Sequence, residues 1–214
     1  MNHVLTPLFL ILLFLASCSQ KGNPHPAETR QISDEIDWQD IYYKRVAAAK
    51  GWKFILVHHS ATHAGNALSF HEYHTQRGYG GLAYHFVIGN GRGAKDGEIQ
   101  EGFRWKQQIS GTHLTVNAWY HNIFGIGICL VGNFDKYPPT KKQIRSLVGL
   151  IRKLARDHGL NRNNVMGHGS APHSEISYSG NQMTVQFIPG KKEMGTCPGK
   201  YFPMKKILKL AFGE

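Results

Sequence analysis

The chain has 214 residues, of which 41% are apolar and 11% are aromatic. This length allows one well-buried core and argues against two large domains, so we expect a single domain of catalytic size. The formal net charge of +11 predicts a surface that attracts anionic polymers or an anionic membrane face, without choosing among nucleic acid, cell wall and lipid.

The beginning of the chain has the features of an export signal. An apolar run, LFLILLFLA, ends in the tetrapeptide Leu15-Ala16-Ser17-Cys18, which resembles the bacterial lipobox. The run is too short to span a bilayer and is typical of a secretory signal peptide, although no Lys or Arg precedes it. We therefore expect a signal peptide over residues 1–17, a lipid on Cys18 and a flexible tether over residues 18–32. An uncleaved apolar anchor is the alternative, and it would also place the remaining chain outside the cytoplasm.

Helices and strands alternate in the first half of the following domain, which we assign to residues 33–214. A capped pattern with near-helical apolar spacing predicts a helix over residues 33–50, and an apolar β-rich run predicts a strand over residues 52–58. A short helix is expected over residues 69–77 and a second strand over residues 82–89.

The second half of the domain continues the alternation. Residues 125–132 are nearly all apolar, which predicts a third strand at the centre of its sheet. A Thr N-cap, apolar residues at helical spacing and a terminal Gly159 predict a helix over residues 140–158. Strand-forming residues on both sides of Ser179-Gly180-Asn181 predict a hairpin over residues 176–188. The whole pattern indicates an α/β fold, with a central mixed β-sheet flanked by helices in a single domain.

Three candidate metal ligands stand at the ends of predicted elements or in glycine-rich turns: His58, His168 and Cys197. Two imidazoles and one thiolate leave an open position on a tetrahedral zinc ion, which is the arrangement of a catalytic site. Water in that position can supply hydroxide for attack on a carbonyl. The ligands lie far apart in the chain, so spacing alone does not establish the site, and His173 is close enough to His168 to replace it.

Several short motifs carry a resemblance to a known family. They lie in the region from about Lys53 to Phe202 and are, in chain order, VHHSAT at 57–62, YHFVI at 84–88, GTH at 111–113, GIGICLVG at 125–132, GH at 167–168 and CPG at 197–199. In this order they resemble the zinc N-acetylmuramoyl-L-alanine amidases of the amidase-2 group, which includes phage T7 lysozyme and the peptidoglycan recognition proteins. The resemblance implies the fold of that group and one zinc ion on His58, His168 and Cys197. It also implies hydrolysis of the bond between N-acetylmuramic acid and L-alanine in peptidoglycan or muropeptides.

The same resemblance implies roles for residues beside the metal. Tyr84 would act in catalysis by donating a hydrogen bond to the oxygen that gains negative charge. His113 and Asn122 would contact the substrate. Cys129 stands where the cytoplasmic recycling enzymes of the group carry a glutamate, and we expect it to be a small buried residue.

One position departs from the family pattern. Related enzymes carry Lys or Thr two residues before the third ligand, where this chain has Gly195. Thr196 is our candidate for the second catalytic residue, and Lys191 and Lys192 are the alternatives. The stretch from 171 to 195 is also longer than in compact members of the group, and we expect it to form a wall of the substrate groove.

Four other kinds of function compete with the zinc amidase. A recognition module would bind peptidoglycan without cutting it, although such domains typically lose the third ligand, which this chain keeps. A cysteine hydrolase would need Cys197 free of metal. A blue-copper site also uses two histidines and one cysteine, but the rest of the chain does not resemble that family. Export would keep the domain away from nucleic acid. We therefore expect a monomer that is exported, is lipid-anchored to a bacterial membrane and acts on peptidoglycan or muropeptides.

Overall fold

The computed structural model describes residues 29–32, 51–179 and 182–213. The expected signal peptide, Cys18, most of the tether and the expected helix at 33–50 lie outside the described residues. Within the described ranges, no helix is both long enough and apolar enough to cross a membrane.

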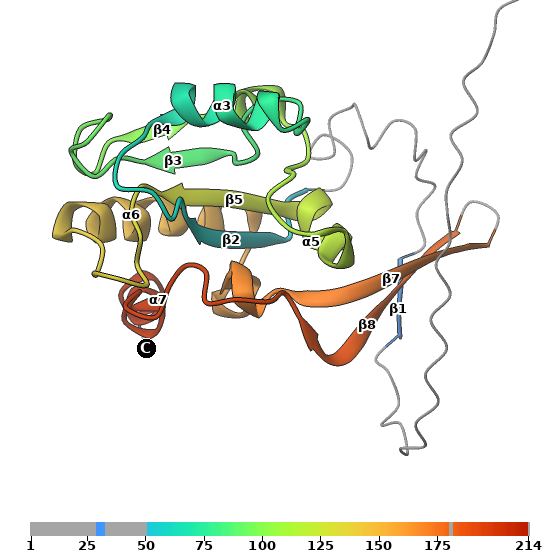
Figure 1. The fold of residues 1–214 in the computed structure, drawn as a ribbon. Helices are drawn as coiled ribbons and strands as arrows, with labels where there is room; N and C mark the ends of the chain where they lie inside the picture. The colour runs from blue at the N-terminus through green and yellow to red at the C-terminus, as the bar shows by residue number, and fades with distance from the viewer. Residues whose placement is uncertain (1–28, 33–50, 180–181, 214) are drawn as a thin grey trace, which may run out of the picture.

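A five-stranded mixed sheet forms the centre of the domain, in the order β4-β3-β5-β2-β6. Four of its strands run parallel: β2 (Phe54–His59), β3 (Phe86–Ile88), β5 (Gly125–Leu130) and β6 (Val165–Gly167). The edge strand β4 (Ile99–Glu101) pairs antiparallel with β3. The middle strand β5 is buried along its whole length, which confirms the central strand expected from its apolar sequence (Figure 1).

Helix α6 (Lys141–His158) covers one face of the sheet, and α7 (Met204–Phe212) packs beside it. Leu147 and Ile151 of α6 share one apolar cluster with Val57 of β2. The expected ends of α6 are confirmed, because Thr140 caps its N-terminus and Gly159 ends it in a left-handed conformation, with φ of 64°.

The opposite face of the sheet is covered by shorter helices. Successive strand residues point to opposite faces, so Leu56 and His58 face away from α6. On this side lie α3 (Ala67–Gln76) and α5 (Trp119–Phe124), visible in Figure 1, where α3 crosses above β3 and β4. The remaining short helices are α4 (Phe103–Gln107) and the 3-10 turns η1 (Val116–Ala118), η2 (Arg162–Asn164) and η3 (His168–Ser170).

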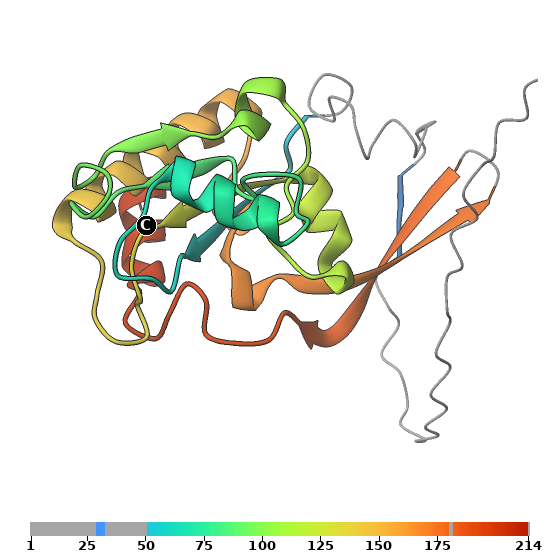
Figure 2. The ribbon, with the colours of Figure 1, turned by 45° about the horizontal axis from the view of Figure 1, so that its top comes forward.

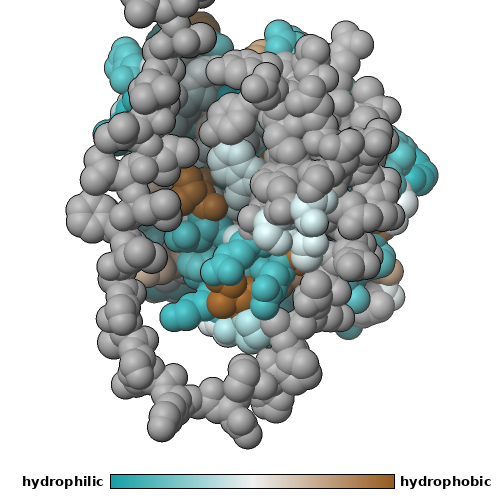
Figure 3. Space-filling view, turned by 90° about the vertical axis from the view of Figure 1, so that its right-hand side faces the viewer, coloured by the Kyte–Doolittle hydropathy of each residue, from teal (hydrophilic) through white to brown (hydrophobic). Residues whose placement is uncertain are grey.

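The expected hairpin is present and longer than predicted. It consists of β7 (Pro172–Ser179) and β8 (Gln182–Lys192), and it projects from the domain beyond α5 (Figures 1 and 2). Between its turn and its base, Val185 of β8 is fully buried in a cluster with residues of α5. Figure 3 views the molecule from this end, where the surface of the described residues is mostly hydrophilic with a few hydrophobic side chains.

Two expectations about strands need correction. Residues Thr29–Ile32, which we assigned to the flexible tether, form strand β1 and pair antiparallel with β8 in a three-stranded sheet. The strand expected over residues 82–89 is shorter than predicted. The backbone N–H of His85 still donates to the carbonyl oxygen of Gly127, but the backbone N–H of Gly127 donates to the side-chain Nδ1 of His85, at 2.9 Å. A side-chain nitrogen therefore accepts this hydrogen bond in place of a backbone carbonyl, and β3 begins at Phe86.

Candidate metal centre

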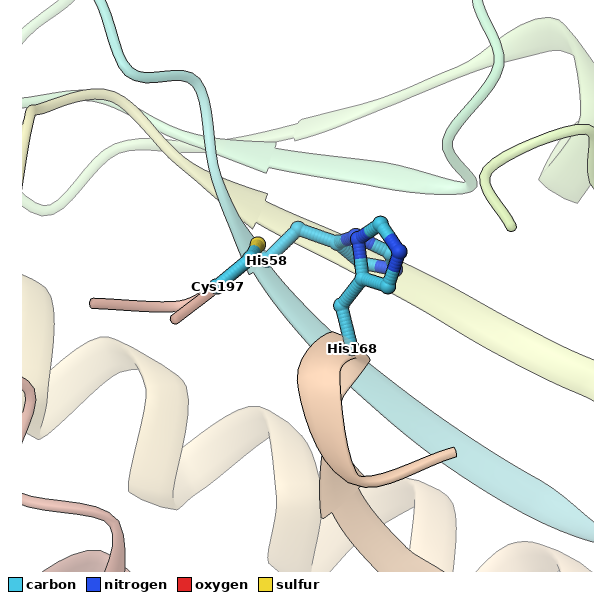
Figure 4. A group of neighbouring side chains, drawn as sticks. All are labelled: His58, His168 and Cys197. Atoms are coloured by element: carbon cyan, nitrogen blue, oxygen red, sulfur yellow. The ribbon is translucent and has the colours of Figure 1, made fainter. Parts of the chain in front are cut away.

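His58, His168 and Cys197 come together at one end of the parallel strands. One ligand atom from each residue lies within 4.8 Å of the others, and it is the one such group of three or more potential ligands that the described residues contain. His58 belongs to β2, and His168 opens η3 directly after the neighbouring parallel strand β6. Cys197 lies in the loop before α7, and Figure 4 shows the three side chains reaching toward one another from these separate elements.

The ring of His58 is held by a second buried histidine, His113. Nε2 of His58 lies 3.1 Å from Nδ1 of His113, and Nε2 of His113 lies 3.3 Å from the carbonyl oxygen of Gly125. A carbonyl only accepts, so Nε2 of His113 donates, its Nδ1 accepts, and Nε2 of His58 carries the hydrogen between the two rings. This order leaves the lone pair of His58 on Nδ1, where a metal can bind it.

Burial keeps His58 in the neutral form that metal binding requires. Loss of solvent lowers its pKa well below the usual value, and the nearby rings of His113 and His168 lower it further. Neutral imidazole binds metal, whereas imidazolium has no free lone pair. His58 therefore needs to release no proton near neutral pH before it can act as a ligand.

Two glycines make room for the ring of His113. A Cβ atom on Gly111 or on Gly127 would overlap the Cδ2 atom of that ring. The backbone N–H of His113 donates to Oδ1 of Asn122 at 2.8 Å, and Asn122 also exchanges hydrogen bonds with both backbone groups of Leu114. The structure thus places His113 behind His58 and uses Asn122 to hold the preceding loop, while the substrate contacts expected of both residues stay predictions.

Cys197 offers a protonated thiol in the absence of metal. Burial raises its pKa to about 12, although the backbone N–H of His59, which donates to the sulfur, acts in the opposite direction. A thiol with this pKa is not a nucleophile at neutral pH, which argues against a cysteine hydrolase. A bound zinc ion would favour the thiolate, and two neutral imidazoles with one thiolate are a donor set that fits zinc.

Tyr84 lies beside the three candidate ligands, just before β3. The centroids of its ring and the His58 ring are 5.1 Å apart. Burial raises the pKa of its phenol well above the usual value, and so does the neighbouring Cys129, with which it forms a hydrogen bond. Tyr84 therefore stays protonated and can act as a hydrogen-bond donor. Cys129 is fully buried on β5, which agrees with the small buried residue expected there.

The candidates for a second catalytic residue lie directly before Cys197 in the chain or at the end of β8. Thr196 is exposed, and its side chain forms a hydrogen bond with Asp135, which lowers the pKa of that carboxyl. Lys191 and Lys192 are exposed at the end of β8. Among the described residues, no contact favours Thr196 over the two lysines as the second catalytic residue.

Sequence reasoning missed Glu193, which contacts His168. Oε2 of Glu193 lies 3.1 Å from Nε2 of His168, and Oε1 lies 3.5 Å from Nε2 of His173. His173, the alternative ligand, therefore packs against Glu193, whereas His168 joins the metal group. In the sequence Glu193 follows two lysines, which is typical of an exposed position, and only its burial in the fold marks it.

A cavity of 510 Å³ opens next to the loop that carries His113. Its lining includes Tyr79, Arg104, Gly111 and Trp119. The guanidinium of Arg104 donates to the carbonyl oxygens of Leu82, Tyr79 and Ser110. Burial lowers the pKa of Arg104 to about 10, so the side chain stays cationic at neutral pH. The cavity therefore has a positive charge on its wall.

Comparison with known proteins agrees with this arrangement. The family model Amidase_2, described as N-acetylmuramoyl-L-alanine amidase, matches residues 48–200. The chain is 30% identical over 128 residues to the N-acetylmuramoyl-L-alanine amidase of Homo sapiens, covering 54% of this chain and 20% of the human protein. It is 34% identical over 100 residues to peptidoglycan recognition protein 1 of Mus musculus, covering 46% and 49%. The matched region thus spans less than half of either relative.

Solved structures show the same fold. The N-acetylmuramoyl-L-alanine amidase LysC from Clostridium intestinale URNW is 26% identical, with a TM-score of 0.55 and coverage of 73% of this chain and 82% of that one. Peptidoglycan recognition protein-LE, solved in complex with tracheal cytotoxin, is 19% identical with a TM-score of 0.53, covers 75% and 82%, and shows likeness of fold alone. With its mixed sheet, its flanking helices and a family model that matches most of the domain, the chain belongs to the amidase-2 family.

Proposed function

We propose that the protein is a zinc-dependent N-acetylmuramoyl-L-alanine amidase that cuts the amide bond between N-acetylmuramic acid and L-alanine in peptidoglycan or muropeptides. The observation that carries the proposal is the group of His58, His168 and Cys197, with ligand atoms within 4.8 Å of one another, in a chain of the amidase-2 family. Zinc bound there would polarise the scissile carbonyl and lower the pKa of water, which supplies the nucleophile.

The residues around the ligands support this chemistry. Tyr84 keeps its proton and can donate a hydrogen bond to the substrate oxygen as negative charge develops on it. Thr196, next to Cys197, is the second candidate donor once its hydroxyl leaves Asp135. The positive charge of Arg104 on the cavity wall favours an anionic ligand, and stem peptides of peptidoglycan carry carboxylates.

A recognition function without cutting is the second candidate. It is favoured by the likeness to peptidoglycan recognition protein 1, and by the cavity next to the loop that carries His113, which offers space for a ligand. The retention of a complete set of two imidazoles and a thiol favours the amidase, since binding alone does not require a metal centre with an open position.

We further propose that the protein is exported and attached to a bacterial membrane by a lipid on Cys18, and that it acts as a monomer without a nucleic-acid partner. The lipobox-like Leu15-Ala16-Ser17-Cys18 supports the anchor. The net charge of +11 adds the electrostatic attraction that stable attachment of a lipidated protein to an anionic membrane usually needs.

The test of the amidase is direct. Full-length protein in detergent is incubated with purified peptidoglycan, with chelator and with zinc restored, and new chain ends are identified by mass spectrometry. We expect free L-alanine amino termini that disappear with chelator and return with zinc. Mutation of an outer partner of a metal ligand lowers activity roughly 10–100-fold. Cys197→Ser removes a ligand itself, so its activity should fall by at least that factor.

The matched control replaces a histidine outside the site. His168→Gln should be inactive, whereas His158→Gln, at the end of α6 on the other face of the sheet, should keep full activity. Binding of peptidoglycan without cutting at every zinc concentration would contradict the amidase and support the recognition function. Cutting that persists in chelator would contradict the metal requirement.

A further inference from the structure

Glu193 is a buried acidic residue that the amidase chemistry described above does not use. It directly follows β8, and its side chain is only 1% exposed. Its backbone N–H donates to the carbonyl oxygen of Ala171 at 2.8 Å, which closes the base of the hairpin next to η3. Strand β8 thus returns the chain to the domain and places the carboxylate of Glu193 beside His168, the residue that begins η3.

Both carboxylate oxygens of Glu193 are held in place. Thr115 donates to Oε1 through its hydroxyl at 2.5 Å and to Oε2 through its backbone N–H at 3.2 Å. Nε2 of His168 lies 3.1 Å from Oε2. Since an ionised carboxylate only accepts hydrogen bonds, Nε2 of His168 carries the hydrogen and its lone pair is on Nδ1.

In the described part of the chain, no lysine or arginine forms an ion pair with Glu193. Among the described residues, its ion-pair partners are the two histidines His168 and His173. A buried carboxylate is costly unless positive charge compensates it. Zinc with one thiolate retains one positive charge, which a carboxylate on the far side of His168 would balance.

We propose that Glu193 is a positioning residue of the metal centre, which fixes the ring of His168 so that Nδ1 binds the metal and increases the basicity of that ligand. The parallel with His58 supports this assignment, because His113 engages the outer nitrogen of that ring in the same way. Outer partners of this kind orient ligand histidines and strengthen their bond to zinc. The inference rests on the zinc site of the proposed function and not on amidase activity.

The experiment measures zinc binding in the full chain without substrate. Glu193→Gln keeps the shape and an acceptor but removes the charge, and Glu193→Ala removes both. Competition with a chelator should show that the dissociation constant for zinc rises roughly 10–100-fold in Glu193→Gln and further in Glu193→Ala. The visible absorption bands of the cobalt-substituted protein should shift, because they report the ligand field at the metal.

Two further variants keep the test decisive. Glu175→Gln removes an exposed carboxylate from β7 of the same hairpin and should leave zinc affinity and the cobalt spectrum unchanged. Thr115→Val retains Glu193 but removes the hydroxyl that holds it, and should weaken zinc binding by a smaller factor.

Unaltered zinc affinity and an unaltered cobalt spectrum in a folded Glu193→Gln protein would overturn the proposal. If that variant does not fold, unaltered affinity in Thr115→Val would do the same. A protein that binds zinc in this manner but cuts no peptidoglycan would refute the amidase and leave this inference standing.

Discussion

Tyr84 lies beside the metal centre and keeps its phenolic proton. Its pKa is raised well above the usual value by burial and by the neighbouring thiols of Cys129 and Cys197. A donor that keeps its hydrogen can stabilise an oxyanion without an energetic cost for reorganisation during the reaction.

Tyr84→Phe should therefore lower kcat by roughly 10²–10³, with little change in KM, because the phenol acts only as charge develops in the transition state. Steady-state kinetics on a defined muropeptide would measure both constants. Tyr73→Phe removes an exposed hydroxyl from α3 and serves as the control. An unchanged kcat in Tyr84→Phe would remove Tyr84 from the catalytic residues.

The site could be predicted from the sequence only in part. His58, His168 and Cys197 stand in short motifs that resemble a family, and this allowed them to be identified although they are far apart in the chain. Glu193 follows two lysines and has no motif. Its role depends on where a hairpin returns to the domain, and this return is a tertiary contact that no local pattern encodes.

At the scale of elements, α5 packs against the hairpin through aromatic rings and one histidine. The ring centroid of His121 is 4.3 Å from that of Phe54 and 5.7 Å from that of Phe187 on β8. Nδ1 of His121 is buried and has no hydrogen-bond partner in the described part of the protein. Burial lowers the pKa of His121 to about 4 from its usual 6.5.

This shift predicts how the stability of the fold depends on pH. Between pH 6.5 and 4, the unfolded chain binds a proton at His121 that the folded chain does not. The free energy of unfolding therefore falls as the pH falls, by about 1.4 kcal/mol per unit for this one group. His121→Phe should remove the contribution, so between pH 7 and pH 5 the variant should lose about 2 kcal/mol less stability than the native chain. Urea denaturation at the two pH values measures the difference, and equal losses would contradict the burial of a neutral His121.

The elements that the sequence predicted well are those with strong local signals. Helix α6 has apolar residues at helical spacing, a capping Thr140 and a terminal Gly159, so its ends were predicted within one residue. Helices α4 and α5 and strands β4 and β6 are too short for a periodic pattern to be distinguished. They exist because the sheet and the neighbouring loops provide partners for them.

At the scale of the whole molecule, the candidate ligands join parts of the chain that fold far from one another in sequence. His58 lies on the second described strand, and Cys197 lies in the last loop before α7. A metal that binds only the folded arrangement stabilises the folded state in proportion to the logarithm of its concentration. The metal would thus connect the early and late segments of the domain.

Free zinc at 100 times its dissociation constant should raise the free energy of unfolding by about 2.7 kcal/mol. Chemical denaturation in zinc buffers would measure this effect, and a chelator should reverse it. Magnesium, which prefers oxygen ligands, should have no effect. Cys197→Ser should lose most of the zinc-dependent gain. Denaturation midpoints that do not respond to zinc would show that the three side chains hold no metal.

The two glycines around His113 limit which substitutions this sequence can accept during evolution. Neither Gly111 nor Gly127 contributes a functional group, yet a methyl group at either position would collide with the ring that supports His58. Selection for activity would therefore purge even alanine at these positions, as strictly as it purges changes of a ligand. A genetic screen for loss of activity would recover them together with His58 and His113, so the mutational target of the metal centre is larger than its set of reactive side chains.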